Sequence, residues 1–127
     1  MVAPLVFITG ASSGIGQALA GRHAQAGWRL ALVARRTDVV AAWAAAQGLG
    51  EDRCVVYGAD VAVPASIAAA GAACLARQGL PDRVIANAGI SVGMDSADYE
   101  DLGVLQDTLA TNNVGMAATF RPFLTAM

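Results

Sequence analysis

A short segment with three glycines, at residues 10–16, has the composition of a phosphate-binding loop. It reads GASSGIG and lies between an apolar run, residues 2–9, and a stretch with helical spacing, residues 14–26. A glycine-rich turn between a strand and a helix lets the free N–H groups of the helix N-terminus face a phosphate. A flexible turn is the alternative, but the position after an apolar run favours the phosphate loop. The predicted phosphate-binding residues are Gly10, Ser12, Ser13, Gly14, Ile15 and Gly16.

The glycines of this loop have different expected roles. Gly10 permits a sharp turn, Gly14 lets the backbone approach a pyrophosphate, and Gly16 lets the helix pack closely on the strand. The hydroxyl groups of Ser12 and Ser13 can add hydrogen-bond donors. The spacing GxxxGxG differs from the GxGxxG pattern, so the loop needs support from other parts of the sequence.

Two arginines, Arg35 and Arg36, follow the second apolar run, residues 28–34. About 20 residues past the glycine loop, a dinucleotide-binding fold places the residue that contacts the adenosine ribose, and an acid there binds the 2′-hydroxyl of NAD. This strand end has no acid, and an arginine can pair with a 2′-phosphate through charge-assisted hydrogen bonds. The sequence therefore favours NADP over NAD, with a solvated strand end as the alternative interpretation. Asp38 comes too late and is expected to support the next helix.

Polar residues also follow the third and fourth apolar runs. Asp60 and Val61 come after residues 53–57, and the segment Asn87-Ala88-Gly89 comes after residues 82–86. Ligands of open α/β sheets bind at the carboxyl ends of strands, where these residues are expected. A helix-capping turn is the alternative interpretation of Asp60.

The three segments TGASSGIG, Asp60-Val61 and Asn87-Ala88-Gly89, in this order and spacing, resemble the short-chain dehydrogenases/reductases over the whole chain. The resemblance implies a Rossmann-type sheet, a nicotinamide cofactor and hydride transfer at an alcohol or carbonyl carbon. It implies that Asp60 accepts from the adenine amino group and that Val61 contributes its backbone. It assigns Asn87 to the central sheet and the cofactor ribose, with Ala88 and Gly89 letting the cofactor lie close. Arg35 is the better match to the family's basic residue.

One candidate catalytic residue comes from the same resemblance. The segment TNNVG, residues 111–115, is similar to the family's helix motif NxxG, and Asn112 matches the residue whose backbone carbonyl holds a water of the proton relay. Asn112 also falls on the apolar stripe of the last predicted helix, where a polar residue needs a partner or a water. An asparagine that only satisfies a neighbouring strand is the alternative.

The family's catalytic tyrosine, with a lysine four residues on and a serine upstream, has no match. Four residues after Tyr57 and Tyr99 stand Val61 and Gly103, and the sequence contains no lysine. A phenol that works near neutral pH needs a fixed positive charge nearby. We therefore expect the N-terminal, cofactor-binding portion of an NADP-dependent oxidoreductase, inactive alone. The alternative is a non-catalytic nucleotide-binding or regulatory module.

Strands and helices must alternate to position these residues, which predicts an α/β fold with a parallel sheet and helices on both faces. We expect one partial domain over residues 1–127, with strand order 3-2-1-4, truncated after the fourth strand and the following helix. Predicted helices cover residues 14–26, 38–47 and 64–78, with Thr37 as a cap and Pro64 in a first turn. The last helix, kinked by Pro122, carries an apolar stripe made of Leu102, Leu105, Leu109, Asn112, Met116, Phe120, Phe123 and Met127.

The composition excludes several other classes of function. The chain has 127 residues, of which 56% are hydrophobic and 14% charged, with a net charge of −2. An acidic balance disfavours nucleic-acid binding. Cys54 and Cys74 lack metal-ligand spacing and are expected to be reduced thiols, and no stretch is apolar and long enough to span a membrane. We expect a cytoplasmic protein with a small alcohol or carbonyl substrate, no metal, a surface-exposed His23, and self-association through the last helix or fourth strand.

Overall fold

The computed structural model describes residues 2–12, 14–88, 103, 106 and 109–126, and strands alternate with helices along this part of the chain. Apolar runs form the strands because residues buried on both faces of a parallel sheet need no polar alternation. The elements are β1 (Leu5–Thr9), α1 (Gly14–Gln25), β2 (Arg29–Ala34), α2 (Thr37–Ala46), β3 (Cys54–Gly58), α3 (Pro64–Arg77), β4 (Arg83–Ile85), a π-helix (Ala110–Val114), α5 (Gly115–Phe120) and a 3₁₀ turn (Arg121–Phe123).

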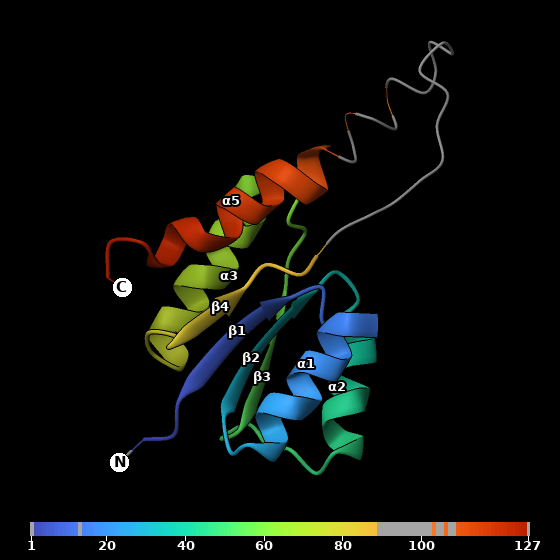
Figure 1. Ribbon diagram of the computed structural model, residues 1–127, viewed down its shortest axis with the longest axis vertical. Coiled ribbons are helices and arrows are strands. Elements are labelled where there is room, and N and C mark those ends of the chain that lie inside the picture. Colours follow the sequence, from blue (N-terminus) through green and yellow to red (C-terminus); the bar gives the residue numbers. More distant parts are fainter. Residues whose placement is uncertain (1, 13, 89–102, 104–105, 107–108, 127) are drawn as a thin grey trace.

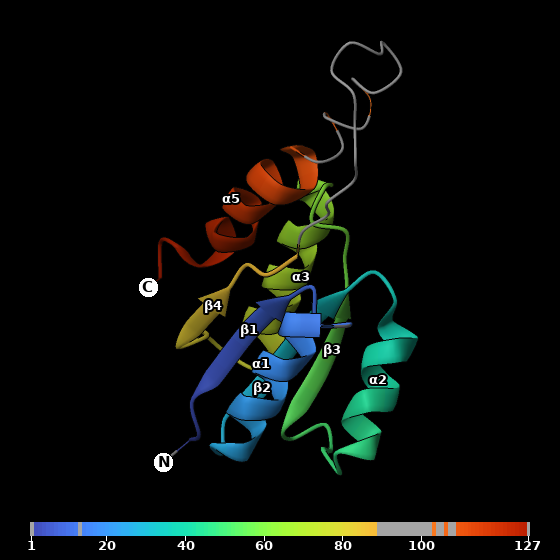
Figure 2. The same cartoon turned by 45° about the vertical axis from the view of Figure 1, so that its right-hand side comes forward.

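The four strands form one parallel sheet in the order β3-β2-β1-β4, as predicted. The register pairs Leu5 with Arg29 and Thr9 with Val33, so the carboxyl ends of the strands share one edge. Figures 1 and 2 show α1 and α2 on one side of the sheet and α3 and α5 on the other. The α/β class with helices on both faces is therefore confirmed.

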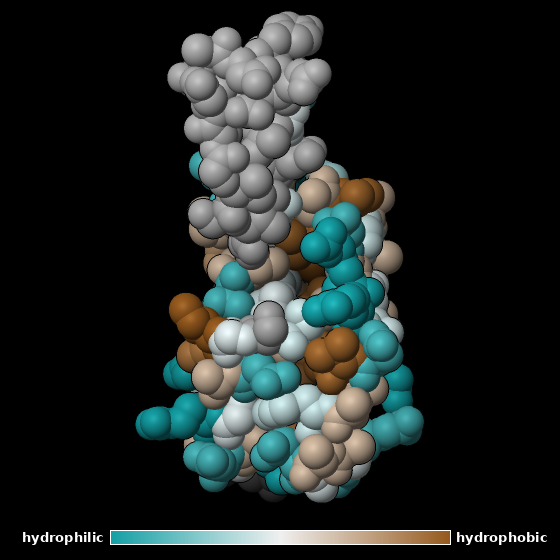
Figure 3. All heavy atoms as spheres, turned by 90° about the vertical axis from the view of Figure 1, so that its right-hand side faces the viewer, coloured by the Kyte–Doolittle hydropathy of each residue, from teal (hydrophilic) through white to brown (hydrophobic). Residues whose placement is uncertain are grey.

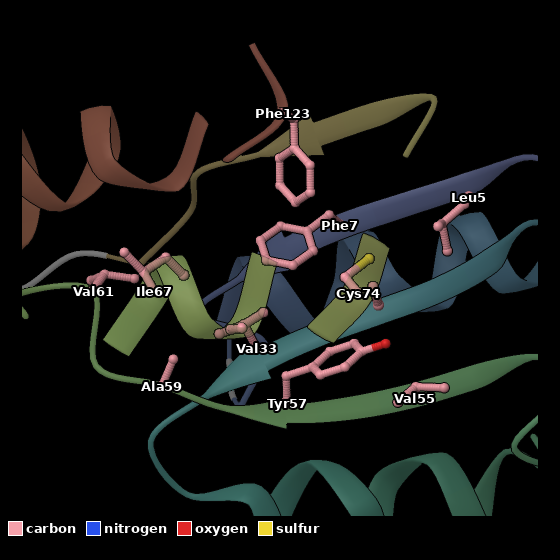
Figure 4. Close-up of a cluster of buried hydrophobic side chains, with 12 residues drawn as sticks. Leu5, Phe7, Val33, Val55, Tyr57, Ala59, Val61, Ile67, Cys74 and Phe123 are labelled. Carbon is pink, nitrogen blue, oxygen red and sulfur yellow. The ribbon is translucent and has the colours of Figure 1, made fainter. Parts of the chain in front are cut away.

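Two apolar clusters, one on each face of the sheet, hold the helices in place. One joins β1 and β2 to α1 and α2, and the other joins the sheet to α3 and the C-terminal segment. In the second cluster Phe123 is fully buried and meets Phe7 of β1 edge-on, with ring centroids 4.9 Å apart. Figure 4 shows the Phe123 ring pointing toward the Phe7 ring. On the side seen in Figure 3, apolar side chains form separate patches among polar ones.

Three strands are shorter than predicted, β2 by one residue and two others by more. β1 begins at Leu5 rather than at residue 2, and β4 has three residues rather than five. Proline has no N–H to give to a sheet, and Pro4 instead accepts from Arg29 N through its carbonyl oxygen at 2.7 Å. Thr37 is also not a cap: it is the first residue of α2, and Arg36 occupies the N-cap position without a side-chain hydrogen bond.

The predicted apolar stripe of the last helix matches the buried face only in part. Its member Phe123 is buried, but Leu109 is 44% and Met116 49% exposed, while Thr119, which was not predicted, is buried. The segment packs closely on its neighbours through glycines: a Cβ on Gly115 would lie 2.7 Å from the Val61 carbonyl oxygen, and one on Gly71 would lie 2.6 Å from the Pro122 ring. Small residues mark this face, so the spacing of large ones misidentified it. Leu102, Leu105 and Met127 lie outside the described residues.

His23 is buried, which corrects the expectation of a surface position. Its Nδ1 lies 2.8 Å from the Leu19 carbonyl oxygen, which can only accept, so Nδ1 carries the proton. Its Nε2 therefore accepts from the Arg83 guanidinium at 2.9 Å, and the Trp28 ring lies edge-on at 5.1 Å. The histidine thus joins α1 to the edge strand β4.

Candidate functional site

The β1–α1 loop contains two kinds of glycine position. A Cβ on Gly10 would lie 2.8 Å from the Ala88 Cα, and one on Gly16 would overlap the Gly10 carbonyl oxygen. Gly14 has φ +58°, and a Cβ there would meet none of the described residues within 4 Å. Protein packing thus closes the space at Gly10 and Gly16, whereas the backbone at Gly14 is open on its outer side. Ile15, which follows it in the first turn of α1, is 72% exposed.

The loop after β4 is fastened to the end of β1 by one hydroxyl group. Thr9 Oγ1 accepts from Asn87 N at 3.1 Å and from Ala88 N at 3.2 Å, and the Asn87 side-chain amide donates to the Gly10 carbonyl oxygen at 3.2 Å. Thr9 is 1% exposed. Thr9 is not among the site residues predicted from the sequence, although a lone hydroxyl at the end of an apolar strand is a signal for such a role.

The end of β2 presents the two arginines that were expected to bind a 2′-phosphate. Arg35 and Arg36 are both exposed, and α2 begins directly after them. Across residues 2–12, 14–88 and 109–126, neither arginine forms an ion pair; the one ion pair there joins Arg77 to Glu51 at 3.4 Å. Asp38 is exposed in the first turn of α2, where the sequence analysis expected it.

The β3–α3 loop turns around Asp60. The Asp60 carboxylate accepts from Ala62 N at 2.9 Å, so one of its oxygens forms a turn within the loop. Asp60 is partly exposed, while Val61 is buried with its carbonyl oxygen against Gly115. The capping-turn alternative and a ligand-facing carboxylate are therefore compatible at this position.

Asn112 lies in the π-helix that precedes α5. The N–H of Gly115 donates to the Ala110 carbonyl oxygen, five residues back, which is the π-helical pattern. Such turns are frequent at functional sites. Gly115 packs on the Val61 carbonyl, so Asn112, three residues earlier, belongs to the segment that reaches the β3–α3 loop. Ser13 and Gly89, the two remaining predicted site residues, lie outside the described part of the chain.

Three buried groups of the core, Tyr57, Cys54 and Cys74, have pKa values well above neutral pH. Burial raises the pKa of Tyr57 to about 12, and its hydroxyl donates to Gln78 Oε1 at 2.8 Å. Burial also raises the pKa of the Cys54 and Cys74 thiols to about 11. Within the described ranges, no group of three His, Cys, Asp or Glu side chains could hold a metal ion, and no helix could cross a membrane. The site is therefore four loops at the carboxyl edge of the sheet, suited to binding.

Known proteins match this arrangement. The short chain dehydrogenase family matches residues 4–127. The 11-beta-hydroxysteroid dehydrogenase A of Arachis hypogaea is 36% identical over 118 residues, which cover 92% of this chain and 34% of that protein. The curated relatives it matches are longer: the chain spans between 34% and 43% of their length.

Solved structures share the fold. An alcohol dehydrogenase from the archaeon Thermococcus sibiricus, complexed with 5-hydroxy-NADP, has a TM-score of 0.86 at 30% identity. The match covers 98% of this chain and 53% of that one. A 3-ketoacyl-(acyl-carrier-protein) reductase from Brucella melitensis, complexed with NADH, has a TM-score of 0.84 at 26% identity and covers 96% of this chain and 49% of that one. The family match and these likenesses agree with the glycine loop and the strand order, and the chain belongs to the short-chain dehydrogenase family.

Proposed function

We propose that this chain is the dinucleotide-binding part of an oxidoreductase that moves hydride between NADP and a small alcohol or carbonyl compound. The observation that carries the proposal is the contrast among the loop glycines. Gly10 and Gly14 both have a left-handed φ, but Gly10 and Gly16 are closed in by protein, whereas Gly14 is open within the described part of the chain. An open backbone at the start of a helix is what a pyrophosphate needs.

The chain's own residues would hold the cofactor at three places. The pyrophosphate would meet the N–H groups around Gly14, Ile15 and Gly16, near the hydroxyls of Ser12 and Ser13. The adenosine half would meet Arg35, Arg36, Asp60 and Val61, and the remaining cofactor ribose would meet the segment Asn87-Ala88-Gly89. The bound cofactor supplies or accepts the hydride, and the protein binds and orients it.

The preference for NADP rests on charge at the end of β2. The related structures include both an NADP-type ligand and NADH, so the likeness alone does not choose between the cofactors. Two exposed arginines and no acid at this strand end favour a ligand with a 2′-phosphate. We assign the main contact to Arg35.

A pair of glycine variants tests the binding site itself. Gly14 and Gly27 both have positive φ, and a Cβ on either meets nothing within 4 Å, so Gly→Ala strains both backbones similarly. Gly14→Ala should lower the affinity for NADP and NAD alike by about tenfold, whereas Gly27→Ala, at the far end of α1, should leave both unchanged. Calorimetric titration of the purified chain measures both. Equal affinities in the two variants would show that the pyrophosphate lies elsewhere.

The proposed role of Asn112 is to hold a water through its backbone carbonyl. The support is the match to the short chain dehydrogenase family over residues 4–127 and the place of Asn112 in the π-helix over Ala110–Val114, a kind of turn that is frequent at functional sites. The catalytic serine, tyrosine and lysine of the family have no match in the sequence, which contains no lysine. The chain alone should therefore show no NADP-dependent turnover of alcohols or carbonyls, and an absorbance assay at 340 nm of about micromolar protein checks this.

We also propose that the chain self-associates. β4 is an edge strand in the described sheet. Val114 in the π-helix, Met116 on α5 and Leu124 after the 3₁₀ turn are 53%, 49% and 68% exposed. Exposed strand edges and apolar side chains favour association. Sedimentation at low micromolar concentration should show a species above the monomer mass; a single folded monomer would contradict the proposal.

Buried, unpaired Cys54 and Cys74 support a reducing, cytoplasmic location.

A further inference from the structure

Three hydrogen bonds converge on Asp60 in the β3–α3 loop. Its carboxylate accepts from Ala62 N at 2.9 Å, and its carbonyl oxygen accepts from Val63 N at 3.0 Å. Its own N–H donates to the hydroxyl oxygen of Ser66 at 3.0 Å. The first two bonds lie within the loop, and only the third ties Asp60 to an element outside it.

Ser66 is a rigid anchor for this bond. It is the third residue of α3, and its N–H donates to the Val63 carbonyl oxygen at 2.9 Å. The next residue, Ile67, is fully buried in the core against the sheet. A hydroxyl on the first turn of a packed helix holds its position better than a side chain on a loop.

We propose that Ser66 is a positioning residue that fixes the Asp60 carboxylate for the adenine ring of the cofactor. The inference rests on the proposed function, in which Asp60 accepts from the adenine amino group. The hydroxyl of Ser66 satisfies the Asp60 N–H and holds the start of the turn, and the turn in turn holds the carboxylate. Without this hydroxyl the Asp60 N–H loses its side-chain partner, and the carboxylate gains freedom that ligand binding must then remove.

The test compares two ligands on the same preparation: NADP and its hypoxanthine analogue, which lacks the adenine amino group. The dissociation constant of the analogue divided by that of NADP reports recognition of that amino group. This ratio does not depend on the fraction of protein that is folded. We expect the chain to bind NADP more tightly than the analogue, and Ser66→Ala to reduce this ratio by about threefold to tenfold. Ser66→Thr retains the hydroxyl and should keep the ratio.

A matched control removes a hydroxyl from a different element, the strand β3. Tyr57→Phe deletes one hydroxyl and its hydrogen bond to Gln78, so it should lower stability without changing the ratio. Asp60→Ala should abolish the discrimination, and the double variant Asp60→Ala/Ser66→Ala should match Asp60→Ala alone, because Ser66 acts through Asp60.

The possible outcomes distinguish a failure of the positioning role of Ser66 from a failure of the assignment of Asp60 to the adenine ring. If Asp60→Ala abolishes discrimination while Ser66→Ala keeps it, the positioning role of Ser66 is wrong and the proposed function stands. If Asp60→Ala keeps the discrimination, both the positioning role and the assignment of Asp60 to adenine are wrong. An additive double variant would also overturn the inference, since Ser66 would then act independently of Asp60.

Discussion

Arginines lie at the amino ends and at the carboxyl ends of the parallel strands, which we call the amino edge and the carboxyl edge of the sheet. The two groups of arginines have different surroundings. At the amino edge, Arg29 donates to the carbonyl oxygens of Ala3 and Gln78, both at 2.9 Å. Arg53, just before β3, donates to the Ala24 carbonyl oxygen at 2.9 Å. At the carboxyl edge, Arg35 and Arg36 are exposed and form no ion pair within the described part of the chain.

The comparison shows that residue type alone does not identify a binding residue. The amino-edge guanidiniums bind backbone carbonyl oxygens at or near the ends of elements, which is a structural role. Arg83 also has a structural role, although its partners are side chains. Its guanidinium donates to His23 and lies 4.7 Å from the centroid of the Trp28 ring. The carboxyl-edge arginines are exposed, so a ligand can reach them.

The largest expected effect is at the carboxyl edge. Arg35→Asp replaces a cation with an anion at the proposed 2′-phosphate contact, so the affinity for NADP should fall by about 10- to 100-fold and the preference should turn toward NAD. The free energy of unfolding should change by less than about 0.5 kcal/mol, because Arg35 is exposed. Titrations with both cofactors measure the first effect, and urea unfolding measures the second.

Arg22→Asp makes the same charge change at an exposed arginine in the last turn of α1, away from the carboxyl edge. Its NADP-to-NAD ratio should stay that of the parent chain. An equal loss in both variants would mean that net charge, and not the position of Arg35, sets the preference.

Alkaline pH should affect the amino edge and leave the cofactor preference alone. Burial raises the pKa of the Cys54 thiol, the first residue of β3, from 9.0 to about 11. Because folding raises this pKa, the stability that the neutral thiol contributes is complete below pH 9 and is lost as pH rises toward 11. The loss from one such thiol is about 2–3 kcal/mol at most.

Unfolding by urea at pH 8 and pH 10.5 measures this loss, and Cys54→Val should reduce it. The variant keeps an apolar side chain of similar size and removes the titrating group. A loss of stability at high pH that is the same in both proteins would place its origin in another group.

Arg29→Met separates the two edges in the opposite sense from Arg35→Asp. It removes the donors to the Ala3 and Gln78 carbonyl oxygens, and we expect a loss of about 2 kcal/mol in the free energy of unfolding. The ratio of NADP to NAD affinity should not change. A changed ratio in this variant would mean that the amino edge influences the cofactor site.

The smallest expected effect concerns the contact between α1 and β4. His23→Leu removes the acceptor for Arg83 and should cost about 1 kcal/mol. Arg83→Met should cost a similar amount, and the two changes together should cost less than their sum, because both remove one interaction. Thermal unfolding of the four proteins measures the coupling, and strict additivity would show that the two side chains do not depend on each other.

The sheet could be predicted from the sequence because its strands are buried on both faces. Leu5 to Thr9 and Leu30 to Ala34 are continuous apolar or small runs, and their positions were found to within a few residues. The buried face of α5 could not be found in the same way, because Gly71 and Gly115 allow a close approach that an apolar pattern does not reveal. His23 was missed since its partner, Arg83, lies 60 residues away.

The candidate site shows a similar division. The glycine loop and the strand ends carry local patterns, so the sequence alone predicts ligand contacts there. Thr9 and Ser66 were missed because their functions depend on Asn87 and Asp60, which tertiary folding brings to them. Residues that hold other residues in place have no pattern of their own until the partner's position is known.

The hydroxyl of Thr9 has a consequence for the rate at which the amide protons of Asn87 and Ala88 exchange with solvent. The amide protons of Asn87 and Ala88 lie outside any strand, yet both are bonded to a side chain that is 1% exposed. Their exchange with solvent deuterium should therefore be as slow as that of neighbouring strand amides. Two residues that are already held in this way, Asn87 and Ala88, add little entropy cost when a ligand settles against them.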